Sequence, residues 1–289
     1  MSELRYGAFA PQGWKLEYAG WDAATAWERT KELAALAQHT SKIKLGQLVT
    51  CAAYRNAGLL AKEAACVDVF SGGRLILGLG AGWYEREYQA YGYAFPSART
   101  RLELLEETLE VVKRLWTEET VTYQGKHLSF DGAYCDPKPL QRLPELWVGG
   151  GGEKVTLRIE AKHADKTNWQ VGLEGFVRKS KLLEQYCNEI GRDFESIVRT
   201  HGPDCRIFDS AADLQRWLDS PEGGSLWGSS RPHTEYVRDN LVGTVEQVTE
   251  KVQAFVDAGC REFVLWFRDF PASESLEAFA CEVVPSVVA

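Results

Sequence analysis

The sequence predicts an α/β fold built on parallel strands, and two features of the chain lead to this prediction. Short apolar segments alternate with helical stretches along the whole chain. Several of these segments are continuously apolar rather than alternating with polar residues, as is typical of strands covered on both faces in a parallel sheet. No change in composition divides the 289 residues, so we expect a single domain over residues 1–289, either a barrel or a doubly wound sheet.

Seven segments are predicted to be strands, and several of them are continuous apolar runs. They cover residues 5–10, 43–51, 74–82, 145–150, 164–170, 196–202 and 262–267. Residues 120–144 interrupt the alternation of strand and helix, and two β-like arms in this segment flank the sequence Gln-Gly-Lys. We therefore predict that residues 120–144 form a hairpin and loop inserted into the domain.

The clearest predicted helix covers residues 99–116, where apolar side chains recur every three or four positions and glutamates occupy the other face. A second helix at 245–260 has Thr244 as its predicted N-cap and Gly259 as its stop. The residues after Lys154 fit a strand or a helix by their apolar spacing. We predict a helix, because a strand directly after four glycines would leave no crossover to the next parallel strand.

The composition excludes several classes of function. The net charge is −8 and no basic run is present, which argues against a nucleic-acid surface. No apolar run approaches the about 18 residues expected of a membrane span. The five histidines and seven cysteines show no metal-ligand spacing, so we expect no metal site. The scattered cysteines, odd in number, predict reduced thiols in a cytoplasmic protein.

Two predicted strands end in glycine clusters, at Gly78, Gly80 and Gly82 and at Gly149 to Gly152. A dinucleotide-binding motif requires G-x-G-x-x-G and an acidic residue about 20 positions later, and neither cluster fits it. The exposed N–H groups of a glycine loop before a helix can instead bind an anion, most simply a phosphate, and Lys154 would add positive charge. The alternative is that the glycines only permit tight turns between strand and helix.

The same stretches carry a family resemblance. Residues 5–14, 42–93 and 145–168, with the order S-G-G-R-L, G-x-G-A-G-W and P-x-x-x-V-G-G-G-G-E-K, resemble the luciferase-like monooxygenase superfamily, and within it the coenzyme F420-dependent oxidoreductases. The resemblance implies a TIM-type (β/α)8 barrel that holds F420 or FMN at its mouth. It also implies three groups of cofactor-binding residues. A backbone bulge behind the ring is implied at Thr50 and Cys51, and the pocket is lined by Gly80, Ala81, Gly82 and Trp83. The phosphate would lie near Gly149, Gly150, Gly151, Gly152 and Lys154.

The sequence departs from this family near its N-terminus. In the family a second strand ends in an Asp-His pair that contacts the cofactor ring, whereas residues 26–46 run from the first helix directly toward the third strand. The expected fold is therefore a barrel lacking the second strand unit, with seven recognisable strands. An opened barrel, a gap filled by the N-terminal segment, or a truncated gene sequence are the alternatives.

Without that Asp-His pair, Glu85 and His201 are the candidate catalytic residues. The alternative for Glu85 is a solvated residue favoured by the dipole of a helix start, and the alternative for His201 is a polar loop residue. Tyr54 and Arg55 are candidate substrate-binding residues, or else a surface pair that begins the next helix. Trp83 is interpreted as a platform for the cofactor ring, with core packing as its alternative.

These residues, read with the family resemblance, predict an oxidoreductase that transfers hydride between coenzyme F420 and a small organic substrate. One alternative is an FMN-dependent monooxygenase that uses reduced flavin and O₂. Another is a catalytically impaired relative that binds a flavin or deazaflavin without turnover. The resemblance further implies a homodimer. We expect a small-molecule substrate and no nucleic-acid or membrane partner.

Overall fold

The computed structural model describes residues 4–8, 40–220, 233–270 and 272–288. Contacts divide the chain into two compact units: a first unit within 1–30, 169–181 and 198–289, and a second within 31–168 and 182–197. The single domain expected from the sequence stays a prediction. The missing second strand unit also stays a prediction, because it would fall on residues 9–39, which lie outside the described residues.

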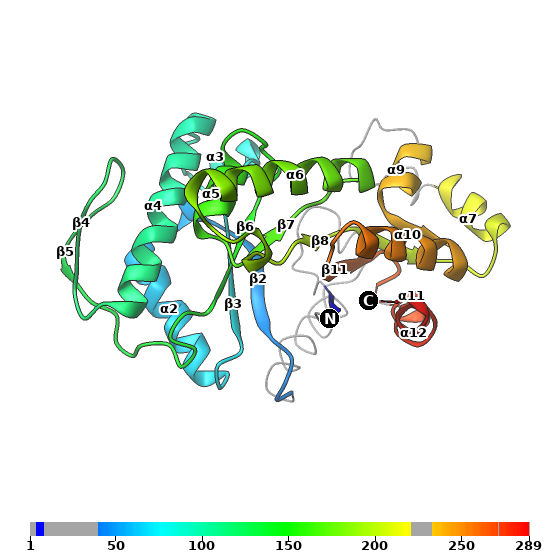
Figure 1. The fold of residues 1–289 in the computed structure, drawn as a ribbon, viewed down its shortest axis with the longest axis horizontal. Coiled ribbons are helices and arrows are strands. Elements are labelled where there is room, and N and C mark those ends of the chain that lie inside the picture. The colour runs from blue at the N-terminus through cyan, green and yellow to red at the C-terminus, as the bar shows by residue number, and fades with distance from the viewer. Residues whose placement is uncertain (1–3, 9–39, 221–232, 271, 289) are drawn as a thin grey trace. The chain divides into compact units, whose positions relative to one another are not determined.

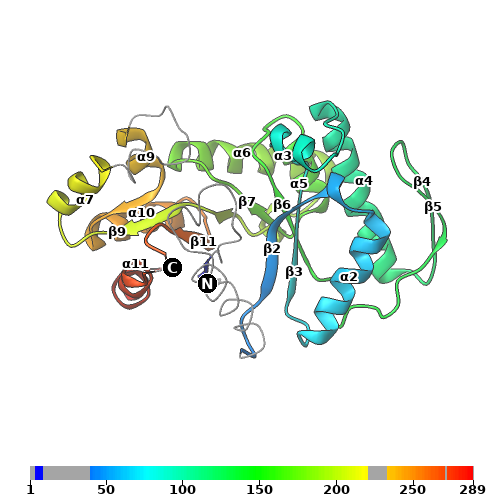
Figure 2. The same cartoon turned by 180° about the vertical axis from the view of Figure 1, so that it is seen from behind.

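The second unit contains a parallel four-stranded sheet in the order β2 (Leu45–Cys51), β3 (Leu75–Gly80), β6 (Glu145–Gly149) and β7 (Lys166–Asn168). Helices α2 (Ala57–Phe70), α4 (Ala98–Thr117) and α5 (Thr156–His163) follow these strands. Leucines and valines of β3 and β6 form one core cluster with these helices, so the helices cover one face of the sheet. Figures 1 and 2 show α2 and α4 on that side of the sheet.

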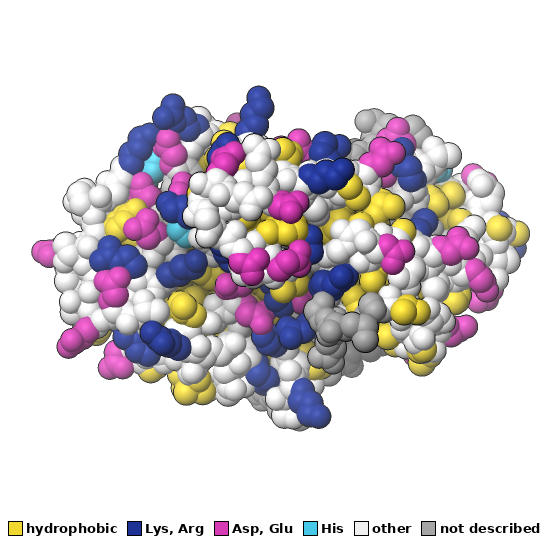
Figure 3. Space-filling model, viewed as in Figure 1, with side chains coloured by type: hydrophobic (Ala, Val, Ile, Leu, Met, Phe, Trp, Pro, Cys, Tyr) yellow, Lys and Arg dark blue, Asp and Glu magenta, His cyan; other side chains and the backbone are white. Residues whose placement is uncertain are grey.

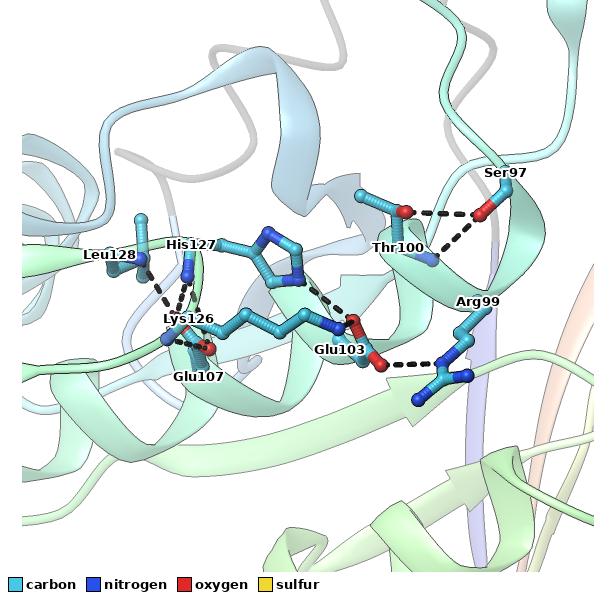
Figure 4. Close-up of polar contacts among 8 residues, drawn as sticks. All are labelled: Ser97, Arg99, Thr100, Glu103, Glu107, Lys126, His127 and Leu128. Atoms are coloured by element: carbon cyan, nitrogen blue, oxygen red, sulfur yellow. Dashed lines mark hydrogen bonds and ion pairs between the residues drawn. The ribbon is translucent and has the colours of Figure 1, made fainter.

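Short elements complete the second unit: η1 (Ala52–Tyr54), α3 (Glu85–Ala90), η2 (Phe194–Ser196) and an antiparallel pair, β4 (Val121–Gln124) with β5 (Ser129–Ala133). This β4–β5 hairpin lies inside the 120–144 segment. Its turn is attached to α4, because the Glu107 carboxylate accepts hydrogen bonds from the backbone N–H groups of Lys126, His127 and Leu128 (Figure 4). The polar turn of the hairpin is thereby held on the amphipathic helix.

The first unit contains a second parallel sheet. Its strands are β1 (Arg5–Ala8), β8 (Thr200–His201), β9 (Asp204–Ile207), β10 (Leu241–Gly243) and β11 (Glu262–Phe267), in the order β1-β11-β9-β10 with β8 also paired to β11. The helical elements are α7 (Ala211–Leu218), α9 (His233–Asp239), α10 (Val245–Asp257), α11 (Glu274–Ala278), the π-helix η4 (Phe279–Val283) and α12 (Val284–Ser286). Helix α6 (Leu173–Ile190) begins in the first unit and ends in the second.

The α/β fold with parallel sheets is confirmed. Each predicted strand overlaps an observed one, and the segment after Lys154 is the helix α5, as predicted. Thr244 caps α10 with its side chain in a capping box with Gln247, as the N-cap pattern indicates. The sequence prediction did not include β9 and β10, which are only four and three residues long.

Two observations concern nucleic-acid and membrane partners. On the face shown in Figure 3, lysine and arginine side chains are interspersed with aspartate and glutamate, and no continuous basic stripe crosses the described residues on this face. Among the described helices, none combines the length and the apolar character that are needed to cross a bilayer. The expectation that the protein has no nucleic-acid and no membrane partner stays a prediction.

Candidate functional site

The carboxyl ends of the second unit's four strands form one row of residues. Cys51 of β2 pairs with Gly80 of β3, Gly80 with Gly149 of β6, and Gly149 with Asn168 of β7. Because registered residues of neighbouring strands point to the same face of a sheet, all four belong to the face opposite the helices. Two of the four are glycines, so no side chain projects from the middle of the row and a neighbouring side chain can pack there.

The strand β2 is interrupted by a bulge next to this row. Its register on β3 shifts between Gln47 and Thr50, and the Leu48–Val49 peptide bond within the shift is cis. The family resemblance implied such a bulge at Thr50 and Cys51, and the structure places it two residues earlier, at Leu48 and Val49. Thr50 and Cys51 have already returned to regular pairing, with Leu79 and Gly80 respectively.

The bulge places the side chain of Val49 on the glycines of the neighbouring strands. A Cβ atom on Gly80 would come within 2.7 Å of Val49 Cγ2, one on Gly149 within 2.7 Å of Val49 Cγ1, and one on Gly78 within 3.0 Å of the same Cγ1. These separations are shorter than carbon–carbon contact distances. The three glycines are therefore required for the packing of Val49, which remains 36% exposed. An apolar, solvent-facing surface results at the strand ends.

The loop after β3 is fixed by a second close approach. Gly82 has φ +75°, and a Cβ there would meet Tyr88 Oη and Cys51 Sγ. Tyr88 is fully buried, its Oη donates to the carbonyl of Ala81 at 3.2 Å, and it lies 3.0 Å from Cys51 Sγ. Burial raises the pKa of the Tyr88 phenol, so it stays neutral. Tyr88 thus contacts both Cys51 of β2 and the loop at Ala81 and Gly82, and it holds this loop against β2.

The remaining candidates of this region lie on its surface. Trp83 is 65% exposed and packs obliquely on Tyr84, with ring centroids 5.3 Å apart. Glu85 is the exposed first residue of α3 and accepts a hydrogen bond from Gln89 at 3.1 Å. The exposure of Trp83 argues against its core-packing alternative.

Tyr54 and Arg55 follow the row at the end of η1. Tyr54 donates to the carboxylate of Glu87 at 3.0 Å, and burial followed by that carboxylate raises the pKa of the phenol. Arg55 is exposed and lies 3.8 Å from Glu63 of α2. The hydrogen bond from Tyr54 to Glu87 therefore links η1 to α3, and the guanidinium of Arg55 lies at the limit of ion-pair distance from Glu63.

The four-glycine segment contains two kinds of position. Gly149 ends β6 and receives Val49, whereas Gly150, with φ +136°, and Gly152 allow the close approach of Thr156 at the start of α5. The carbonyl of Gly152 accepts the N–H of Leu157 at 3.2 Å. Gly151 and Lys154 are exposed at the amino end of α5. Gly149 therefore admits the side chain of Val49, whereas Gly150 and Gly152 permit the turn into α5.

His201 belongs to the first unit and is buried in its core. It is 1% exposed, its ring stacks on Phe255 with a centroid separation of 4.0 Å, and Nδ1 lies 3.1 Å from the carbonyl of Trp169. Burial lowers the pKa of His201 to about 4, so the imidazole is neutral near pH 7. A catalytic role for His201 stays a prediction that this burial disfavours, because a substrate cannot contact an enclosed ring.

Two residues of the site were missed from the sequence. Val49 reaches the glycines only because of the bulge, which leaves no local sequence pattern. Asn168 ends a strand beside Gly149, and its Oδ1 atom is buried without a hydrogen-bond partner among the described residues. A polar residue at the end of a buried strand, aligned with a glycine cluster, is a signal that could have identified Asn168.

Comparison with known proteins places these features in context. The family model described as luciferase-like monooxygenase matches residues 7–227. The chain is 33% identical over 282 residues to an F420-dependent glucose-6-phosphate dehydrogenase of Kineococcus radiotolerans, covering 86% of this chain and 80% of that protein. It is 26% identical over 295 residues to an FMNH(2)-dependent dimethylsulfone monooxygenase of Pseudomonas fluorescens, covering 93% and 80% respectively.

A solved structure extends the likeness to the fold. The structure of an F420-dependent secondary alcohol dehydrogenase in complex with an F420–acetone adduct superposes with a TM-score of 0.78 at 20% identity. The match covers 98% of this chain and 90% of that one. At this level of identity the likeness establishes the fold alone.

Proposed function

The chain belongs to the luciferase-like monooxygenase family, and from this premise we propose that it is an oxidoreductase transferring hydride between coenzyme F420 and a small organic substrate. The observation that carries the proposal is the packing of Val49 on Gly78, Gly80 and Gly149. This packing supports a site for a flat ring at the strand ends of the second unit.

The residues present fit a flavin-like ring on physical grounds. A planar aromatic ring binds best on an apolar surface without projecting side chains, and Val49 supplies one above a row whose middle positions are glycines. Trp83 adds a large exposed aromatic surface in the loop after β3. Cys51, at the β2 end of the row, is held by Tyr88 and so forms a fixed border of the surface.

The phosphate of either cofactor would be held by Gly150, Gly151 and Gly152 together with Lys154. The amino end of an α-helix presents backbone N–H groups and a partial positive charge, and this loop leads directly into α5. α5 lacks a side-chain N-cap. Its N-cap residue, Val155, makes no side-chain hydrogen bond to the first turn, in which the N–H of Leu157 donates to the carbonyl of Gly152.

When bound, F420 supplies the hydride chemistry itself. The protein's contribution in our proposal is to fix the ring on Val49 and to exclude water from the covered side. Glu85 is the candidate for holding or moving a proton, since its carboxylate is exposed in the first turn of α3, directly after the loop of Trp83. Arg55 and Tyr54, at the end of η1, are the candidates for substrate contact.

A second function has its own support. The relative of Pseudomonas fluorescens, which covers more of this chain, is named for FMNH(2), so an FMN-dependent monooxygenase that uses reduced flavin and O₂ is the alternative. We favour F420, because identity to the F420-dependent relative is higher, at 33%. The third candidate is that this protein binds F420 or FMN without turnover, and the experiment must distinguish it from the two enzymes.

The test is a parallel titration of the purified protein with F420, FMN and reduced FMN, followed by turnover with a panel of alcohols and carbonyl compounds. Micromolar binding of F420 with hydride transfer supports the proposal. Tighter binding of reduced FMN with O₂ consumption supports the monooxygenase instead, and binding without turnover supports the impaired relative. If neither cofactor binds at micromolar concentration, the proposal is wrong.

The cellular setting remains our prediction from the sequence. A cytoplasmic location is supported by the seven cysteines, all of which are free thiols. The homodimer is retained as a prediction from the family resemblance.

A further inference from the structure

Asn168 is the one residue with a polar amide in the row of strand ends. It is the last residue of β7 and pairs with Gly149, which itself lies under Val49. Lys166, two residues earlier, lies 5.0 Å over the ring of Trp147, the register partner of that lysine. Because strand side chains repeat every second residue on one face, Lys166 and Asn168 both point to the face that carries Val49.

The amide of Asn168 is incompletely satisfied. Its Oδ1 atom is buried and accepts no hydrogen bond from any described residue. Lys166, on the same strand, does not donate to this oxygen. Its ammonium group lies 2.8 Å from the carboxylate of Glu145 and over the ring of Trp147. Buried polar atoms in folded proteins are nearly always hydrogen-bonded. Asn168 as a whole is only partly buried, so a ligand bound beside it can approach the amide. An unpaired amide oxygen at the border of an open apolar surface therefore indicates a donor that arrives with a ligand.

The position of Asn168 limits what that donor can be. Neighbouring strands lie about 4.8 Å apart, so the amide stands one strand away from the surface of Val49 over Gly149. A ring lying flat on Val49 would present its edge, rather than its face, to this amide. A primary amide carries an acceptor and a donor side by side. Its complement is a ring edge on which an N–H group is next to a carbonyl group.

We propose that Asn168 binds the imide edge of the cofactor ring, with Oδ1 accepting the ring N–H and Nδ2 donating to the adjacent carbonyl. The inference rests on the proposed function, because it requires a flavin or deazaflavin ring on Val49. Both F420 and FMN carry this edge on the pyrimidine half of the ring. Asn168 thus sets the orientation of the ring in the site and leaves the choice between the two cofactors to other residues.

The test compares F420 and FMN with their N3-methylated counterparts, in which the ring N–H is replaced by N–CH₃. Wild-type protein should bind the parent cofactor about tenfold more tightly than its methylated form, as expected for one hydrogen bond. Asn168→Ala should lose about tenfold in affinity for the parent and bind both forms equally. Asn188→Ala, which alters an exposed asparagine of α6, should behave as wild type. Thermal unfolding shows whether each variant is folded.

Two results overturn the inference. The first is equal binding of the parent and methylated cofactors by the wild-type protein, a result that needs no variant. The second is a folded Asn168→Ala protein that keeps the wild-type affinity and discrimination, in which case an ordered water satisfies Oδ1. Failure of the wild type to bind either parent cofactor is a different result, because it removes the proposed function together with this inference.

Discussion

The side chain of Val49 lies so close to Gly149 that a Cβ atom on the glycine would come within 2.7 Å of Val49 Cγ1. The contact joins β2 to β6 across β3, and it depends on the bulge that lifts Val49 out of the regular register. The glycine at the start of the four-glycine segment is thus explained by a neighbour within the protein. The surface that Val49 forms is what a ring would contact.

Gly149→Ala should destabilise the protein by about 1–3 kcal/mol, because the new methyl group and Val49 cannot occupy the same space. The free energy of unfolding measured in urea checks this. Gly7→Ala is the matched control, since a Cβ at that strand position would lie 3.7 Å from Val264 Cγ1, an ordinary contact. Equal stability of the Gly149 variant and the control would show that Val49 does not rest on Gly149.

Glu107→Ala should lower the free energy of unfolding by about 1–3 kcal/mol, because the carboxylate satisfies three backbone N–H groups of the β4–β5 turn (Figure 4). Limited proteolysis should cut the variant first within the hairpin. Glu110→Ala, on the same helix, is the control. If the two variants lose the same stability, the carboxylate of Glu107 does not hold the turn.

His163 should make the protein less stable in mild acid. The residue is 5% exposed at the end of α5, and burial, followed by the charges of Lys113, Lys162 and Arg192, lowers its pKa to about 3. In the unfolded chain His163 has the ordinary histidine pKa of 6.5, so the protein loses stability as pH falls from about 6.5 toward 3. At about pH 4.5 the loss from this group amounts to roughly 2–3 kcal/mol.

The measurement for His163 is urea unfolding at about pH 7 and pH 4.5. His163→Gln cannot titrate, so its stability should fall by about 2–3 kcal/mol less than that of wild type between the two pH values. His233→Gln, which alters an exposed histidine, should keep the wild-type dependence. Parallel loss in the wild type and in the His163 variant would contradict the assigned cause.

Glu85→Gln should reduce turnover by about 100-fold if its carboxylate moves a proton, within the range typical of general acid–base groups. Cofactor affinity should not change, because the side chain lies outside the Val49 surface. Glu119→Gln, at an exposed position just after α4, is the control. Unchanged turnover in the Glu85 variant would leave this residue as a solvated first-turn glutamate.

Sequence reasoning located the parts of the fold that strong local patterns determine. The apolar run of β3 and the segment before Gly149 are buried strands, as their composition indicates. β9 contains Asp204 and Arg206, and this polar composition masks a strand whose pairing with β10 and β11 is set by tertiary contacts. β10 is too short to form a pattern.

The candidate site was only partly predictable from the sequence, because its glycines are visible there and the register of its strands is not. Glycine clusters indicate close approach, and the approach at Gly80 and Gly149 is real, although the approaching group is Val49. A register shift is a property of two paired strands, so Val49 could not be identified from β2 alone. The burial of His201 likewise follows from Phe255 of α10, more than fifty positions away in the chain.

The most direct test of the account is the affinity for F420 of Val49→Lys compared with Val67→Lys. Both valines are partly exposed, at 36% and 44% respectively, so a lysine can direct its charge into solvent at either position. We predict at least tenfold weaker binding for the Val49 variant, wild-type binding for the Val67 variant on α2, and similar thermal midpoints for both. Wild-type affinity in a folded Val49→Lys protein would contradict the claim that the ring rests on Val49.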